Sequence, residues 1–449
     1  MKKIKYFFIF LNLYAATSYQ TAYSAVQKAT FNPAADWLQQ ESQIAEIQLL
    51  KNISPPGTHL GVVIASPQND NPDYFRNWVR DAALTMDVVL QLAKKNQDQI
   101  KAKYLNKLLN DYAVFSRQNQ LAAGLGEPLF EVTGKLYDKR WGRPQNDGPA
   151  LRAIVLIAWA ELLIDGGQID YVNKNLYQAE LPGNSVIKAD LEYVSAHWGD
   201  PCFDLWEEVE ADHFYTKMVQ RKALIMGAKL AQRLNDSGAA NWYLLQAKRL
   251  ENSIRGHIVE KENWIGASLN WSKGLSSKTS NLDISVILGV LHGKQDSFFA
   301  ASDLNVITTF TKLKNVFSDL YPINGSKKSL APALGRYPED IYAGTDFRGG
   351  NPWVLATLAG AEYSYRVAQE VAATHLSLAM KWMKNGDLYV ERVQHHANSD
   401  GTLSEQIDRN TGFMTSARDL TWNYSALLTT LWARQESELQ LKKQQGKNK

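Results

Sequence analysis

The chain has 449 residues, of which 45% are hydrophobic, and this content excludes an intrinsically disordered protein. A formal net charge of +3 provides no basic excess, so we expect neither a nucleic acid nor an anionic membrane as partner. The one cysteine, Cys202, cannot form an internal disulfide, so stability must come from a large packed core.

The first 25 residues have the features of a secretory signal peptide. Lys2, Lys3 and Lys5 precede the apolar run 6–16, and small residues follow it. This run is too short to cross a bilayer, although an uncleaved membrane-tethering anchor is the alternative interpretation. Removal of the leader would lower the formal charge to about zero. We therefore expect a secreted or periplasmic protein, and a monomer.

Helical patterns dominate the remainder of the chain. The predicted helices cover 81–95, 150–164, 213–234, 238–258, 352–368 and 420–434. Ser416 and Asp419 form a predicted capping box ahead of the last helix. Helices that are apolar on nearly every side must be buried by other helices, which indicates two concentric layers. We predict one all-α domain over 30–441, followed by a disordered basic tail over 442–449.

Two acidic segments, 204–209 and 403–406, supply candidate catalytic groups. Glu207 and Glu208 are adjacent and follow Trp206, so repulsion and enclosure would favour a protonated carboxyl near neutral pH. Glu405 lies between Ser404 and Gln406, which could orient it through hydrogen bonds. Two carboxyls brought together by the fold can cleave a glycosidic bond. The alternative is a helix N-terminal pair and an ordinary loop carboxylate.

Charged and aromatic residues elsewhere could bind a sugar. Arg80 and Asp81 offer donors and acceptors to hydroxyls, although a capping residue with a surface ion pair would look the same. Tryptophan and tyrosine rings offer flat faces for a pyranose, or simply belong to the core. The aromatic candidates are Tyr74, Trp78, Trp141, Trp206, Trp353 and Trp422.

No cofactor or metal site is expected. His395 and His396 have no acids at ligand spacing, and 398–401 reads as a turn rather than a calcium loop. The sequence also contains neither a phosphate-binding glycine loop nor a nucleophile elbow. Cys202 is predicted to be a small buried residue and not a nucleophile.

Seven segments occur in a fixed order along the chain: 73–81, 141–149, 204–209, 335–340, 349–353, 403–406 and 416–422. Together they resemble the glucoamylases, the inverting, exo-acting glucan 1,4-alpha-glucosidases of glycoside hydrolase family 15. The resemblance extends from Asn71 to Trp432 and implies an (α/α)6 toroid of six inner and six outer helices. It implies hydrolysis of terminal α-1,4-linked glucose from starch-type glucans and maltooligosaccharides, with release of β-D-glucose.

The resemblance also implies roles for individual residues. Glu207 matches the general acid and Glu405 the general base. The substrate-binding positions it implies are Tyr74, Arg80, Asp81, Trp141, Trp206, Glu208, Arg336, Trp353 and Trp422. A glucodextranase or a trehalose hydrolase of the same fold is the alternative enzyme, and a non-catalytic sugar-binding module is the alternative outside enzymes.

Overall fold

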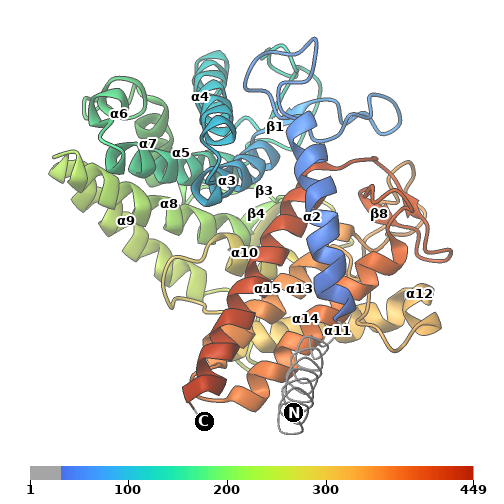
Figure 1. Ribbon diagram of the computed structural model, residues 1–449. Coiled ribbons are helices and arrows are strands. Elements are labelled where there is room, and N and C mark those ends of the chain that lie inside the picture. The colour runs from blue at the N-terminus through green and yellow to red at the C-terminus, as the bar shows by residue number, and fades with distance from the viewer. Residues whose placement is uncertain (1–31, 448–449) are drawn as a thin grey trace, which may run out of the picture.

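The computed structural model describes residues 32–447, so the predicted signal peptide lies outside the described residues. Its helices alternate along the chain between an outer and an inner layer (Figure 1). The outer helices are α2 (Pro33–Lys51), α4 (Gln99–Ala122), α7 (Val186–His197), α9 (Ser237–Arg255), α11 (Leu304–Leu320) and α14 (Leu376–His396). The inner helices are α3 (Val79–Lys95), α5 (Asp147–Asp165), α8 (Phe214–Arg233), α10 (Ser285–His292), α13 (Val354–Val371) and α15 (Thr421–Lys447). Two short helices, α6 (Ile169–Asn175) and α12 (Pro322–Ser326), lie in the connections.

The inner helices form a closed ring. Helix α3 packs on α5, α5 on α8, α8 on α10, α10 on α13 and α13 on α15, and α15 returns to α3. Outer helices cover this ring, for example α9 on α8 and α14 on α13. The predicted double-layered (α/α)6 toroid is therefore confirmed.

The burial of each layer follows from its sequence pattern. In the outer helix α9, Ala240, Tyr243, Ala247, Leu250 and Ile254 are buried, at spacings of three and four residues along one face. The inner helix α5 is buried around most of its circumference, as its nearly continuous apolar run predicted.

Helix α15 differs from the prediction at both ends. Residues 442–447, which the sequence predicted to be a disordered tail, continue the helix. The predicted capping box is wrong, because Ser416 lies before the helix starts and its hydroxyl donates to Glu405. The basic composition of residues 442–449 suggested a solvated tail. The same charges are equally well solvated on the exposed face of a long helix.

Short antiparallel strands brace the loops at one end of the toroid. They are β1 (Asn77–Trp78) with β2 (Leu129–Phe130), β3 (Cys202–Phe203) with β4 (Val209–His213) and β7 (Ser268–Gly274), β5 (Ile258–Val259) with β6 (Trp264–Ile265), and β8 (Gln406–Ile407) with β9 (Met414–Thr415). Cys202 in β3 is buried, as predicted.

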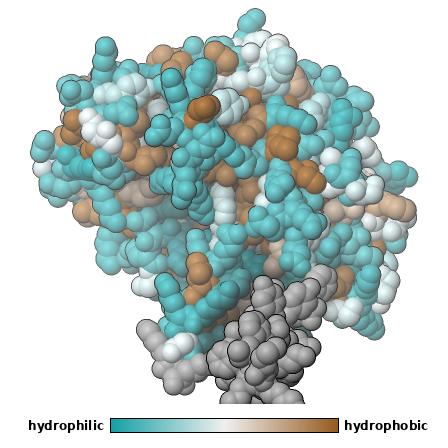
Figure 2. Space-filling model, viewed as in Figure 1, coloured by the Kyte–Doolittle hydropathy of each residue, from teal (hydrophilic) through white to brown (hydrophobic). Residues whose placement is uncertain are grey.

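Hydrophilic side chains cover most of the face seen in Figure 2, with hydrophobic residues scattered among them. Among the helices of the described chain, none is long and apolar enough to cross a membrane.

Candidate active site

One pocket of about 620 Å³ collects every site residue proposed from the sequence. Those residues are Tyr74, Trp78, Arg80, Asp81, Trp141, Trp206, Glu207, Glu208, Arg336, Trp353, Glu405 and Trp422. They come from the connections that lead from an outer helix into an inner one, or from the first turn of an inner helix. The pocket therefore lies at the N-terminal ends of the inner helices, an end of the helix that favours negative charge.

Glu207 lies in the turn between β3 and β4. Its Oε1 accepts hydrogen bonds from Trp78 Nε1 at 2.8 Å and from Gln145 Nε2 at 3.1 Å. Neither of these two donors bonds the other oxygen, Oε2. The backbone φ of Glu207 is +70°, a conformation that is costly for a glutamate and that the surrounding structure must enforce.

Burial raises the pKa of Glu207 above that of a free glutamate, and the charge of Arg80 together with the bonded donors works against this rise. A carboxyl in such surroundings retains its proton to higher pH than an exposed one.

The neighbouring Glu208 has different partners. Its two oxygens accept from Arg336 Nη2 at 2.9 Å and from the Tyr337 hydroxyl at 2.6 Å. Arg336 also donates to Asp340 and lies 5.2 Å from the centre of the Trp353 ring. Glu208 is thus held within an ion-pair network, whereas Glu207 has an oxygen available for a proton.

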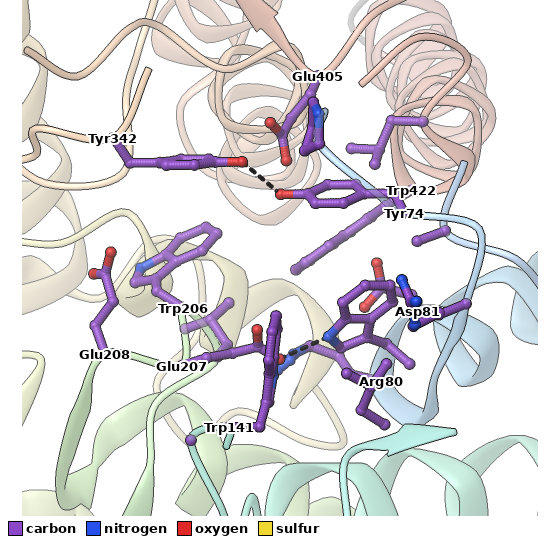
Figure 3. Close-up of a pocket in the computed structure, with 18 of the residues that line it drawn as sticks. Tyr74, Arg80, Asp81, Trp141, Trp206, Glu207, Glu208, Tyr342, Glu405 and Trp422 are labelled. Carbon is purple, nitrogen blue, oxygen red and sulfur yellow. Dashed lines mark hydrogen bonds between the residues drawn. The ribbon is translucent and has the colours of Figure 1, made fainter. Parts of the chain in front are cut away.

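Glu405 lies across the pocket from Glu207 (Figure 3). Its Oε2 accepts from Gln406 Nε2 at 3.0 Å and from the Ser416 hydroxyl. Burial raises the pKa of Glu405 to about 7, although Ser416, Tyr74 and Arg336 stabilise its ionised form. Orientation by Gln406 is as predicted, but Ser404 does not contribute its hydroxyl, and Ser416 takes that place.

Arg80 and Asp81 are both buried, so the alternative of a surface ion pair is wrong. Arg80 donates to Gln145 Oε1 through both terminal nitrogens and lies 3.0 Å from Asp147 through Nε. Burial raises the pKa of Asp81 to about 6, with Arg80 opposing the rise. Because Gln145 accepts from Arg80 and donates to Glu207, it connects these two residues.

Aromatic rings line the walls of the pocket. Trp206 lies 5.6 Å from Trp353 and 6.4 Å from Trp422, and Trp78 lies 6.0 Å from Trp141, between ring centroids. In the described part of the chain, the buried indole N–H groups of Trp141 and Trp353 have no hydrogen-bond partner. Both nitrogens are shielded from solvent, and the Trp141 indole lies near the carboxyl of Glu207, whose ionised form it stabilises.

Trp422 lines the pocket from the first turn of α15. It also lines a second, much smaller cavity of about 50 Å³ near the middle of the barrel. Its indole therefore separates the pocket from the interior of the toroid.

Gln145 and Ser416, which bond the candidate acids, were not among the predicted site residues, and neither was Tyr342, which lines the pocket. Gln145 and Ser416 fall within two of the seven ordered sequence segments, so the segments already indicated these parts of the chain. Tyr342 lies outside those segments, and its hydroxyl is 2.9 Å from that of Tyr74. Only the fold reveals this contact.

No cluster of potential metal ligands is found among residues 32–447. His395 is exposed, while the ring of His396 is half-buried and bonds the Gly412 carbonyl.

The sequence profile named "Glycosyl hydrolases family 15" matches residues 43–432. The chain belongs to this family. The match covers the toroid and every segment that contributes to the pocket.

Individual relatives support the same assignment. A glucoamylase of Blastobotrys adeninivorans is 37% identical over 88% of this chain and 70% of its own length. Glucoamylase 1 of Rhizopus oryzae is 36% identical over 92% of this chain and 73% of its own. A solved glucoamylase from Saccharomycopsis fibuligera superposes with a TM-score of 0.81 and 29% identity, covering 92% of this chain and 98% of that one.

Proposed function

We propose that this family 15 member is an inverting, exo-acting glucoamylase that removes glucose from the non-reducing ends of α-1,4-glucans. The observation that carries the proposal is the placement of Glu207 and Glu405 on opposite sides of one aromatic-lined pocket. The glucoamylases among its relatives support the choice of substrate. The likeness to glucoamylases implies a pocket closed at one end, which admits a chain end and favours exo action over cleavage within a chain.

In the proposed reaction Glu207 is the general acid. Its Oε1 is occupied by Trp78 and Gln145, so the proton is carried on Oε2 and passes to the glycosidic oxygen as the C1–O bond breaks. Its raised pKa lets it retain that proton to higher pH than an exposed glutamate would.

Glu405 is the proposed general base. It removes a proton from a water molecule that attacks C1 from the face opposite the leaving group. The water oxygen becomes the anomeric hydroxyl, so the product is β-D-glucose. Ser416 and Gln406 stabilise the ionised form that this step requires.

The remaining pocket residues would hold the sugar. Arg80 and Asp81 provide a cation and a carboxylate for the hydroxyls of the terminal glucose. The faces of Tyr74, Trp206 and Trp422 supply apolar surface for the C–H face of a pyranose. Glu208 would serve the leaving-group side, and Arg336, which donates to it, would help Arg80 and Asp81 to hold the terminal glucose.

The cellular setting is part of the proposal. Lysines followed by an apolar run at the N-terminus support export, with residues 1–25 as the signal peptide. The exported protein would act as a monomer on soluble maltooligosaccharides or dextrins.

Incubation of the purified protein with maltotriose tests the function. The expected first products are maltose and β-D-glucose, which proton NMR distinguishes from α-D-glucose before mutarotation. Isomaltose and trehalose serve as controls, and faster hydrolysis of either would instead support one of the alternative enzymes. Initial release of the α anomer would contradict the inverting mechanism, and an absence of hydrolysis would contradict the enzyme assignment.

A further inference from the structure

The turn that carries Glu207 is closed by Asp204. The Oδ1 of Asp204 accepts from the backbone N–H groups of Glu208 at 2.8 Å and Val209 at 3.2 Å. The carbonyl of Asp204 accepts from the N–H of Glu207 at 2.9 Å. These bonds allow one turn to direct Glu207 into the pocket and Glu208 toward Arg336.

Lys278 binds this turn from outside the pocket. Its Nζ lies 3.0 Å from Asp204 Oδ2 and 2.6 Å from Asp283 Oδ2, and its side chain is 2% exposed. Asp283 in turn accepts the indole N–H of Trp206, at 3.0 Å from each carboxylate oxygen. One ammonium therefore connects two carboxylates, and each carboxylate holds a residue of the turn.

A third contact reaches the other end of the turn. The ammonium of Lys278 lies 4.2 Å from the centre of the Tyr337 ring, and the Tyr337 hydroxyl donates to Glu208. Lys278 is not among the residues that line the pocket, so it would not touch the substrate.

The left-handed backbone of Glu207 needs such support. A non-glycine residue with positive φ persists only where its surroundings enforce it. Asp204 enforces it through backbone hydrogen bonds, and Lys278 both neutralises Asp204 and limits its movement. Without the ammonium, two buried carboxylates would repel each other and the turn would lose its anchor.

We infer that Lys278 is a positioning residue, which sets the orientation of Glu207 as proton donor through Asp204, Asp283 and Trp206. The inference rests on the proposed function. It predicts that loss of Lys278 impairs protonation of the leaving group more than it impairs binding or the attack of water.

The test compares maltose with α-glucosyl fluoride, whose leaving group needs little protonation. Lys278→Met removes the charge. A second variant, Lys278→Met with Asp283→Asn, removes opposite charges together, so the net buried charge of the cluster does not change and the fold is better preserved. The amide oxygen of the introduced asparagine can still accept the indole N–H of Trp206.

Lys188 provides a matched control. It is also 2% exposed, lies 2.6 Å from Asp236 and 3.5 Å from Glu192, and has the ring centres of two tyrosines within 6 Å. It does not line the pocket. Lys188→Met should therefore lower the melting temperature without changing the ratio of the two rates.

For both Lys278 variants we expect kcat on maltose to fall about 10²-fold, the order of loss that a displacement of about 1 Å produces. On α-glucosyl fluoride the loss should stay below roughly tenfold, and KM should change little. Equal losses on both substrates, or a lowered melting temperature with wild-type rates, would overturn the positioning role of Lys278 and leave the proposed function intact. A wild-type protein inactive on both substrates would overturn the proposed function, and this inference with it.

Discussion

Removing the Ser416 hydroxyl should raise the pKa of Glu405 and move the acidic limb of the pH–rate profile to higher pH. Burial already raises this pKa to about 7, and the hydrogen bond from Ser416 opposes the rise by stabilising the carboxylate. Loss of the bond destabilises the ionised form, so the pKa rises further. A base must be ionised to act, and a higher pKa therefore costs activity on the acidic side.

The expected size follows from the energy of the bond. A hydrogen bond to a charged group contributes about 1.5–3 kcal/mol, and the neutral acid would retain part of it. A difference of about 1.4 kcal/mol between the two protonation states corresponds to one pKa unit. Thus kcat/KM on maltose should fall about tenfold at each pH below the limb, with a smaller change on the plateau.

The assay is the pH dependence of kcat/KM for Ser416→Ala and Ser416→Gly. Two variants are needed because Ser416 has a φ of +68°, which strains alanine but not glycine. A shift common to both variants reports the hydroxyl rather than the backbone. Ser404→Ala is the control, since its hydroxyl makes no bond to Glu405 and the limb should not move. An unmoved limb in both Ser416 variants, or the same shift in Ser404→Ala, would refute the reasoning.

Three further predictions concern the acids and the mouth of the pocket. Glu207→Gln should lose about 10²–10⁴-fold in kcat on maltose but much less on α-glucosyl fluoride, whereas Glu405→Gln should lose activity on both, as steady-state kinetics would reveal. A crystal structure should place the carboxyls of Glu207 and Glu405 about 6.5–9.5 Å apart, since a separation of roughly 5–5.5 Å indicates a retaining enzyme. Phe347 lines the pocket although it is 69% exposed, so Phe347→Ala should lower kcat/KM severalfold on maltoheptaose but little on maltose. The control is Phe413→Ala, because Phe413 is similarly exposed and lies outside the pocket. Equal effects of the two substitutions would contradict a binding role for Phe347.

The sequence was informative wherever pattern alone determines structure. Apolar residues at helical spacing predicted the layers, because a helix that is apolar on most sides has few ways to be buried. The segments around Arg80, Glu207 and Glu405 were correctly grouped, and the structure lines one pocket with them. The predicted all-α pattern contained no strands, whereas Glu208 is followed by β4 and Glu405 by β8.

The sequence was less informative where a side chain had several possible hydrogen-bond or ion-pair partners. Ser416 fits a capping box by spacing, yet it bonds Glu405, because the strand pair β8–β9 brings the two residues together. Arg80 resembled a surface charge, yet Gln145 and Asp147 enclose it. Such choices depend on contacts between segments distant in sequence, which local spacing does not encode.

The strained positions show how these contacts serve the proposed chemistry. Glu207 and Ser416 both have a positive φ. Glu207 is the proposed acid, and Ser416 donates a hydrogen bond to the proposed base, Glu405. Asp204 bonds the backbone of the Glu207 turn, and Gly344 packs so closely on Ser416 that an added Cβ would come within 2.4 Å of the Ser416 hydroxyl oxygen. Packing energy from the large helical core supports these unfavourable conformations. A stable toroid can therefore keep two carboxyls in fixed, different environments, which is what separates an acid from a base.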